Sequence, residues 1–217
     1  MTAPVRVVVA DDQAAIRTGL VLILGSAPGI EVVAEATVGL DAVAQAGRLR
    51  PDVVLMDIRK PGIDGIEATR RLVRDGVCDV LVLTTFDLDT YVDDALAAGA
   101  AGFLLKTVEA PALIAAVRAV ARGDGVLAPE VTRRVLARLP TSPAPVPDPV
   151  PGLDDLTARE RDVLACLAEG LSNAEIATRL VITEATTKTH VSRVLTKLGL
   201  RSRVQAAIAA RAAGLTD

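Results

Sequence analysis

Aromatic side chains are almost absent from this chain of 217 residues, which contains two Phe, one Tyr and no Trp. Its hydrophobic residues, 51% of the total, are therefore nearly all aliphatic. Flavin sites and base-stacking RNA surfaces are built around aromatic rings, so neither is expected here. The same scarcity argues against a regulator that binds an autoinducer in an aromatic-walled pocket.

Cysteine and long apolar runs are also lacking. Cys78 and Cys166 are far apart and lie in apolar stretches, so they indicate neither a metal-binding pair nor a disulfide framework. No apolar run approaches a membrane-spanning length, and the first residues lack the basic and apolar regions of a signal peptide. We expect a soluble protein of the reducing cytoplasm with no membrane partner.

Six of the twelve prolines fall between Pro140 and Pro151, in the stretch PTSPAPVPDPVP. Alternating prolines exclude helix and sheet hydrogen bonds and favour an extended, semi-rigid chain. We interpret this stretch as a spacer between two domains. The alternative interpretation is a ligand for a proline-binding module.

Charge differs on the two sides of this spacer. Met1 to Val120 contains 11 basic and 16 acidic residues, whereas Leu153 to Asp217 contains 9 basic and 8 acidic ones. From Arg179 onward there are 7 basic and only 2 acidic residues, although the whole chain has a net charge of −3. Contact with nucleic acid is therefore expected only at the C-terminal end.

The N-terminal segment alternates β-branched runs with stretches of helical length. Nearly continuous hydrophobic runs such as VRVVVA and DVVLM are typical of strands buried on both faces of a parallel sheet. We predict an α/β domain with a doubly wound, five-stranded parallel sheet. The expected strands are Val5–Ala10, Glu31–Ala34, Asp52–Met56, Val80–Thr84 and Gly102–Leu105, and the expected helices include Gln13–Gly25, Ile66–Arg74, Thr90–Ala98 and Glu109–Ala121.

The C-terminal segment shows no strand pattern and three capping boxes instead. Each places a hydroxyl residue three positions before a Glu or Gln: Thr157 with Glu160, Ser172 with Glu175, and Ser202 with Gln205. A further helix is expected from Thr183 to about Leu198, with Gly199 at its C-terminal end. Short helices with a basic end predict a small all-α helix-turn-helix domain.

Polar residues gather where the predicted strands end. Asp11 and Asp12 follow the first strand, Asp57 the third, Thr84 the fourth and Lys106 the fifth. The carboxyl ends of parallel strands are where functional groups collect in open α/β sheets. Taken singly, Asp11 or Asp12 could instead cap the first helix. Taken with Asp57, they form a group of carboxylates that needs a cation, and an all-oxygen set favours Mg²⁺.

Phosphoryl transfer onto a carboxylate is the chemistry that fits this group. Asp57 would be the nucleophile, with Mg²⁺ held by Asp12 and Asp57 and with Asp11 binding the waters of the metal. Lys106 would supply a second cation, and the Thr84 hydroxyl would donate to a phosphoryl oxygen.

The runs VVVADDQ, LMDIRKPGIDG, VLTTF and GFLLKT resemble the receiver domain of bacterial two-component response regulators. The resemblance implies a flavodoxin-like fold and phosphorylation of Asp57 by a sensor histidine kinase. It also implies that Thr84 and Phe103 move together on phosphorylation, with Thr85 as the small neighbour of Thr84. Without the resemblance, Phe103 would be assigned to the core. Lys60 and Thr107 depart from the family, which commonly has Met and often a cis-proline there.

The stretch from LTARERDVL through GLSNAEIA to KTHVSRVLTKLGLRSR resembles the LuxR-type helix-turn-helix. Together with a receiver it is similar to the NarL/FixJ subfamily. The resemblance implies a supporting helix over Asn173–Leu180 and a recognition helix over Glu184–Leu198 in the major groove of an operator. By resemblance, base contacts would come from Lys188, Thr189 and Ser192, and phosphate contacts from Thr183, Thr187, Arg193, Lys197 and Arg201. A packing position for Thr187 is an equal alternative.

We therefore divide the chain into a receiver (1–122), a connecting helix with a proline-rich linker (123–152) and a helix-turn-helix domain (153–217). The expected function is transcriptional regulation rather than enzymatic turnover. The expected partners are a sensor histidine kinase, double-stranded operator DNA and a second copy of the chain, with RNA polymerase as a further candidate. In LuxR-type domains the helix corresponding to Ser202–Ala212 pairs the subunits, here with Val204, Ala207, Ile208 and Arg211 on one face.

Two other functions compete with this interpretation. A pseudo-receiver would never accept phosphate, which the complete acidic set argues against. A phosphohydrolase usually needs a carboxylate two residues after its nucleophile, where this chain has Arg59. A nucleotide enzyme is not indicated, because glycine-rich phosphate-binding motifs are missing.

Overall fold

The computed structural model describes residues 3–58, 65–84, 92–127 and 152–215. These residues form two compact units. The first runs to Arg122 and also includes Val126 and Leu127, whereas the second comprises Gly123–Gly125 and the C-terminal helices. The proline-rich stretch interpreted as a spacer lies outside the described residues, as do Arg59, Lys60 and Thr85.

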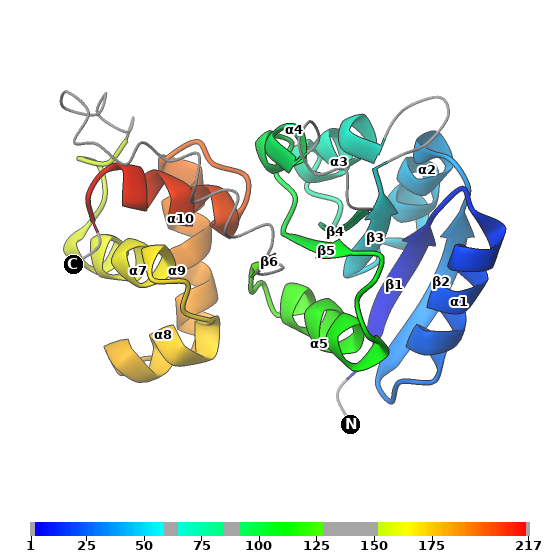
Figure 1. The fold of residues 1–217 in the computed structure, drawn as a ribbon. Helices are drawn as coiled ribbons and strands as arrows, with labels where there is room; N and C mark the ends of the chain where they lie inside the picture. Colours follow the sequence, from blue (N-terminus) through cyan, green and yellow to red (C-terminus); the bar gives the residue numbers. More distant parts are fainter. Residues whose placement is uncertain (1–2, 59–64, 85–91, 128–151, 216–217) are drawn as a thin grey trace. The chain divides into compact units, whose positions relative to one another are not determined.

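The first unit is built on a parallel sheet with the strand order β2-β1-β3-β4-β5-β6 (Figure 1). Its strands are β1 (Val5–Ala10), β2 (Ile30–Ala36), β3 (Val53–Asp57), β4 (Asp79–Thr84), β5 (Gly102–Leu105) and β6 (Val126–Leu127). The predicted flavodoxin-like sheet of five parallel strands is confirmed, and β6 extends it. A strand of two residues is too short to give a periodic signal, so it was not expected from the sequence.

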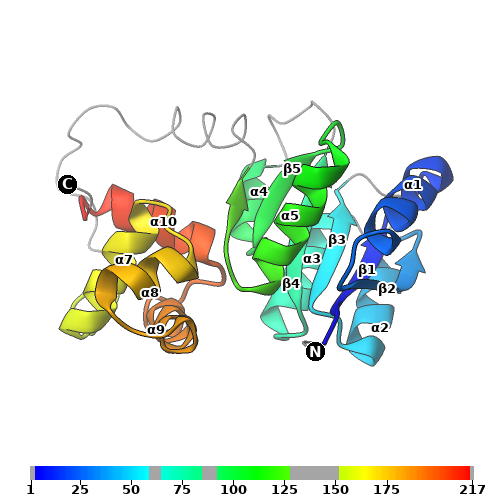
Figure 2. The same cartoon turned by 90° about the horizontal axis from the view of Figure 1, so that it is seen from below.

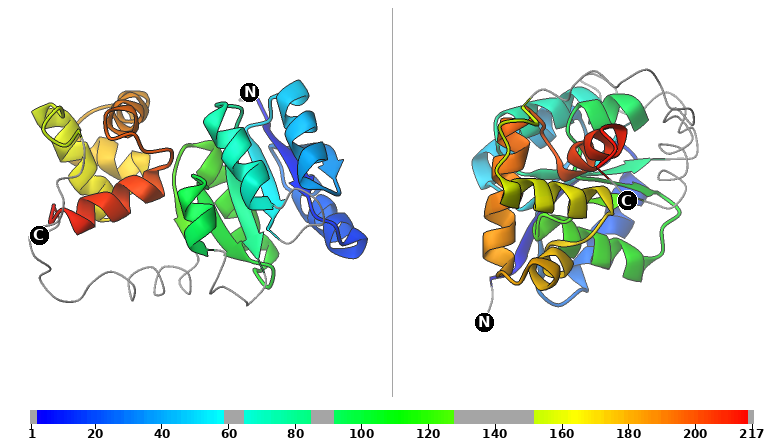
Figure 3. Two further views of the ribbon diagram at one scale, coloured as in Figure 1. Left: turned by 90° about the horizontal axis from the view of Figure 1, so that it is seen from above. Right: turned by 90° about the vertical axis from the view of Figure 1, so that its left-hand side faces the viewer.

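Helices cover both faces of this sheet. They are α1 (Ala14–Gly25), α2 (Gly39–Leu49), α3 (Gly65–Arg74), α4 (Val92–Ala97) and α5 (Ala110–Ala121). Helices α1 and α5 lie on the face seen from below (Figure 2), and α2, α3 and α4 lie on the face seen from above (Figure 3, left). The doubly wound arrangement leaves the strand ends as the place where polar groups of the sheet can meet.

The core explains why the strands read as continuous hydrophobic runs. Val7 and Val9 of β1 pack with Leu55 of β3 and with Leu113 of α5 on one face. The alternate residue Val8 is also fully buried, although it points to the opposite face. Both faces of β1 are thus covered from Val7 to Ala10, and the polar residues Asp11 and Asp12 follow directly at its carboxyl end.

The second unit is helical, with α7 (Ala158–Ala168), α8 (Asn173–Leu180), α9 (Glu184–Lys197) and α10 (Arg203–Ala212) (Figure 3, right). Its core joins all four helices through residues such as Leu164, Ile176, Val194 and Ala210. This arrangement confirms the predicted all-α domain. Among the described residues, no helix has both the length and the apolar character that a membrane span requires.

The predicted caps determine where these helices begin. Thr157 and Ser172 each accept a hydrogen bond from the backbone three residues on, and Glu160 and Glu175 return to the cap residue, which completes both capping boxes. Ser202 caps α10 in the same way, but the Gln205 side chain accepts from the Arg201 N–H instead. Thr183 caps α9.

Candidate functional site

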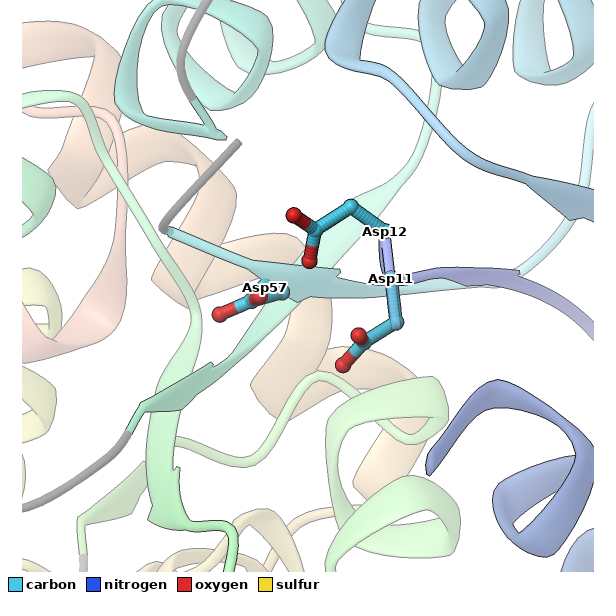
Figure 4. A group of neighbouring side chains, drawn as sticks. All are labelled: Asp11, Asp12 and Asp57. Carbon is cyan, nitrogen blue, oxygen red and sulfur yellow. The ribbon is translucent and has the colours of Figure 1, made fainter. Parts of the chain in front are cut away.

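Three carboxylates meet where β1 and β3 end. Asp57 is the last residue of β3, and Asp11 and Asp12 directly follow β1, the strand beside it. One oxygen from each carboxylate lies within 4.8 Å of the others (Figure 4). Asp11 and Asp57 are buried, whereas Asp12 is exposed. The sequence-based grouping of these residues is thus reproduced in space, with one side open to solvent.

Neither Asp11 nor Asp12 is the N-cap of α1, so the helix-capping alternative is wrong. The N-cap residue is Gln13, and its side chain makes no capping bond. Asp11 Oδ1 instead accepts a hydrogen bond of 2.9 Å from the Gln13 N–H. This bond turns the chain at the end of β1 and leaves Asp11 Oδ2 to pair with the ammonium group of Lys106.

Lys106 supplies a cation to this acidic group. Its Nζ lies 2.8 Å from Asp11 Oδ2 and 2.9 Å from Asp57 Oδ2, with only 8% of the side chain exposed. Burial alone would lower the pKa of Lys106, but its hydrogen bonds to Asp11 and Asp57 outweigh that effect and raise the pKa. The ammonium group therefore stays charged and offsets two buried carboxylates.

The backbone around the site fixes these side chains. The Lys106 N–H donates to the Thr84 carbonyl over 2.8 Å, which ties the end of β5 to the end of β4. The Thr84 side chain is buried at the end of the strand that follows β3 in the sheet. A Cβ at Gly65 would lie 2.2 Å from the Asp57 carbonyl oxygen, so only glycine allows α3 to start here. The peptide bond after Lys106 is trans.

Phe103 is fully buried on β5, beside Val82 of β4 and Leu127 of β6. Its ring therefore occupies an interior position in this structure. That position agrees with the core assignment made from the residues alone, and it leaves the implied movement of Phe103 as a prediction.

The second unit presents a polar surface on α9. Lys188, Thr189, Ser192 and Arg193 are exposed, whereas Val191 and Val194 are buried against the core. Thr183 and Arg201 are exposed near the two ends of this helix. The helix therefore packs on one side and offers hydroxyl and cationic groups on the other. His190 is half-buried between these surfaces.

Comparison with known families assigns both units. Residues 7–118 match the response regulator receiver domain, and residues 154–210 match the bacterial regulatory proteins of the luxR family. The chain belongs to the two-domain response regulators. It is 41% identical over 206 residues to the transcriptional regulatory protein LiaR of Bacillus subtilis, covering 94% of this chain and 95% of that protein.

Two further relatives of this response regulator share nearly its full length. The DNA-binding transcriptional activator DevR/DosR of Mycobacterium tuberculosis is 39% identical over 205 residues, covering 94% of this chain and 93% of the relative. The crystal structure of the response regulator ChrA, from a heme-sensing two-component system, is 39% identical with a TM-score of 0.56, covering 99% of this chain and 100% of that one. The receiver and LuxR-type resemblances are thereby confirmed, and the family consists of DNA-binding transcription regulators.

One residue expected on the DNA surface of this response regulator lies inside it. Thr187 is fully buried, and its Oγ1 donates to the Thr183 carbonyl over 3.2 Å. A phosphate contact by Thr187 is therefore wrong for this conformation, and the packing alternative is correct. The reason is helical periodicity, which places Thr187 on the same side as Val191 and Val194.

Lys197 is also engaged within the protein. Its Nζ lies 2.7 Å from Glu160 Oε2 and donates to the Asp155 carbonyl over 2.9 Å. These two bonds use two of the three N–H donors of the ammonium group, and 34% of the side chain is exposed. The phosphate contact by Lys197 therefore stays a prediction. A lysine near the end of a basic helix gives no sequence signal that its side chain pairs with a carboxylate of another helix.

Arg159 was not expected from the sequence to support the helix-turn-helix. Its Nη2 donates to the Leu180 carbonyl at the end of α8. The LTARERDVL motif contained the residue, but nothing in the motif indicated its partner.

Proposed function

We propose that this response regulator accepts a phosphoryl group on Asp57 from a sensor histidine kinase and that phosphorylation controls its binding to operator DNA. An Asp57 oxygen would attack the phosphorus of the kinase phosphohistidine, breaking the P–N bond and forming an acyl phosphate. Because its target is chromosomal DNA, the protein would act in the cytoplasm.

The observation that carries this proposal is the position of Asp57. It is 2% exposed at the end of β3, with a lysine ammonium 2.9 Å away and two further aspartates beside it. The ammonium group offsets the negative charge of this buried carboxylate, which otherwise would be unfavourable away from water. Lys106 can also neutralise charge on the incoming phosphoryl oxygens without first having to be recruited.

The acidic group fits a divalent cation of the Mg²⁺ class. Its ligands are all carboxylate oxygens with no His or Cys, and the exposed Asp12 leaves one side open for waters that Mg²⁺ retains. Asp12 and Asp57 would hold the ion, and Asp11 would bind its waters. When bound, Mg²⁺ would offset the negative charge that gathers as phosphate approaches.

Thr84 and Phe103 would report the phosphorylated state to the rest of the receiver. Thr84 ends the strand next to Asp57 and shares a backbone bond with Lys106, so its hydroxyl can donate to a phosphoryl oxygen. Phe103 belongs to the next strand, where rearrangement of its ring would accompany that shift. Exchange of Thr84 for Ala should uncouple phosphorylation from DNA binding.

DNA recognition would use the exposed side of α9. Lys188, Thr189 and Ser192 would read base edges, and Thr183, Arg193 and Arg201 would bind phosphates. One such helix makes few base contacts, so two copies of the chain on two half-sites are needed for useful specificity. On α10, Val204 is only 5% exposed, so Ala207, Ile208 and Arg211 are the residues of this face that remain accessible for subunit pairing.

Phosphorylation is tested by incubating the protein with acetyl phosphate and Mg²⁺ and measuring the intact mass. Wild type and the exposed control Asp75→Asn should each gain one phosphate, and Asp57→Asn should gain none. Phosphorylation of Asp57→Asn to the same extent would refute Asp57 as the acceptor. Absence of phosphate from wild type would favour the pseudo-receiver alternative.

DNA binding is tested with a duplex that the phosphorylated wild type selects from a random-sequence library. Lys188→Ala should weaken binding to this duplex by about 1–3 kcal/mol and relax base preference at one position. Arg193→Ala should weaken all duplexes alike and reduce the salt slope by about one unit. An unchanged preference in Lys188→Ala, or equal affinity with and without phosphorylation, would contradict the proposal.

A further inference from the structure

Two consecutive residues in the first turn of α7 hold the ends of the two helices of the helix-turn-helix. Arg159 donates from Nη2 to the carbonyl of Leu180, the last residue of α8. Glu160 accepts from the ammonium group of Lys197, the last residue of α9, over 2.7 Å. We call these two contacts the α7 clamp. These contacts connect α7 to both α8 and α9. An ion pair between residues of a single helix connects no second helix.

The Glu160 contact is strongly constrained. Its side chain is 4% exposed, and its Oε2 also accepts from the Thr157 N–H over 2.9 Å as part of the capping box. Hydrogen bonds from Lys197 and then Thr157 lower the pKa of Glu160 to about 2. A buried carboxylate without a cation is strongly unfavourable, so Glu160 holds the end of α9 in place.

The backbone at Lys197 is fixed as well. A Cβ at Gly152 would lie 2.2 Å from the Lys197 carbonyl oxygen, and Gly152 has a φ of +83°, which glycine adopts without strain. The chain before α7 therefore packs directly on the last turn of α9. Lys197 is held through both its main chain and its ammonium group.

The Arg159 contact lies beside a strained turn. Val181 follows Leu180 with a φ of +55°, in the left-handed region, and is 89% exposed. A β-branched residue persists in that conformation only where its surroundings hold it there. The bond from Arg159 to the Leu180 carbonyl is one such restraint, and it fixes the turn that determines the angle between α8 and α9.

We propose that Arg159 and Glu160 are positioning residues for DNA recognition and that Lys197 acts through Glu160 instead of binding a DNA phosphate. This inference rests on the proposed DNA-binding function. Lys188 lies nine residues before Lys197, which corresponds to about 13 Å along a helix. A small tilt of α9 about its base would therefore displace the residues that read bases, while leaving the number of cations facing DNA unchanged.

The test compares two cations of α9 in the full-length, phosphorylated protein. Lys197→Gln removes the clamp lysine, and Arg193→Gln removes an exposed cation of the same helix as a matched control. Glu160→Gln and Arg159→Gln remove the other partners, and Lys197→Arg preserves the ion pair. Affinity is measured by fluorescence anisotropy over a range of KCl concentrations, for the duplex selected by wild type and for a scrambled duplex.

Arg193→Gln should reduce the salt slope by about one unit on both duplexes. Lys197→Gln, Glu160→Gln and Arg159→Gln should leave the slope unchanged and reduce the preference for the selected duplex about tenfold. The Glu160→Gln/Lys197→Gln double variant should lose no more than either single variant, and Lys197→Arg should restore the preference. Thermal unfolding of each variant establishes that it is folded at the assay temperature.

Three outcomes would overturn the inference. A lower slope with unchanged preference in Lys197→Gln would make this lysine a phosphate contact. Lower melting temperatures with unchanged sequence preference in the Glu160 and Arg159 variants would mean that the α7 clamp only stabilises the fold and does not position α9 for DNA recognition. Failure of wild type to prefer any duplex would overturn the proposed function together with the inference. The first two results, in contrast, would overturn the inference alone.

Discussion

Lys106 Nζ lies 2.9 Å from Asp57 Oδ2, so the carboxylate proposed to accept phosphate is already paired with a cation. The same ammonium group pairs with Asp11, and only 8% of the lysine side chain is exposed. One cation thus offsets two buried negative charges in the structure. A metal ion bound by the acidic group would share these carboxylates with Lys106.

Replacing Lys106 by Met should therefore make the folded protein more dependent on metal. Without the ammonium group, Asp11 and Asp57 repel each other, and breaking such a buried pair costs about 3–5 kcal/mol. We expect a lower melting temperature in EDTA and a larger increase on adding Mg²⁺ than in wild type. For comparison, a ligand that binds only the folded state stabilises it by about 2.7 kcal/mol when its concentration is 100 times its Kd.

Differential scanning calorimetry with and without Mg²⁺ measures this effect. Asp75→Asn, which changes an exposed residue of an ion pair with Arg74, should respond as wild type does. An equal response of Lys106→Met and wild type to Mg²⁺ would show that the lysine and the metal do not share the acidic group.

Thr187→Val should be tolerated, because the Thr187 side chain is buried and its hydroxyl donates to the Thr183 carbonyl within the same helix. That carbonyl also accepts from the Thr187 N–H over 2.9 Å, so it keeps a partner. We expect a change in unfolding free energy within about 1 kcal/mol and an unchanged salt slope. Urea denaturation measures the unfolding free energy, and DNA titration measures the salt slope. A slope lower by one unit would show that Thr187 contacts a phosphate after all.

Acid should release the contact between Glu160 and Lys197 only at very low pH. Because folding lowers the Glu160 pKa from 4.5 to about 2, its stabilising effect is complete above 4.5 and is lost as pH falls toward 2. The Thr157 amide donates to Glu160, so its NMR chemical shift should report this titration. A midpoint near 4.5 would mean that the carboxylate gains nothing from folding. Glu160→Gln, which lacks the titrating group, is the control.

Val181→Gly should stabilise the second unit. The left-handed conformation costs a residue with a Cβ about 1–2 kcal/mol, and glycine avoids this cost. Glycine also has more freedom to lose on folding, which offsets about 0.5–1 kcal/mol of the gain. Little buried area is lost, since Val181 is 89% exposed. We expect a net gain on the order of 1 kcal/mol, measured by thermal unfolding, and a smaller one for Val181→Ala. A less stable glycine variant would indicate that the valine side chain makes a needed contact.

The sequence predicts the receiver well because its strands are buried on both faces. VRVVVA and GFLL coincide with β1 and β5 as observed, and the neighbouring strands differ by one or two residues at their ends. The acidic site is equally predictable, since Asp11, Asp12, Asp57 and Lys106 all follow from where strands end. No contact beyond the sheet topology is needed to bring them together.

The DNA surface is less predictable because it depends on rotation about a helix axis and on long side chains. Thr187 resembles its exposed neighbour Thr189 in composition but lies on the opposite side of α9. Lys197 resembles Lys188, yet its flexible stem reaches a carboxylate 37 positions earlier in the chain. Residue type specifies neither difference, since both are set by how α9 packs on α7.

The two outer strands of the sheet limit how two receivers can associate. An open sheet edge offers unpaired backbone groups to strands of other chains, which favours continued, open-ended assembly. Here one edge, β6, has two residues, and the other, β2, carries the exposed charges of Glu31 and Glu35. Both features discourage strand addition. We therefore expect receivers to pair through helical surfaces, which can close a dimer and stop there, instead of building a fibre.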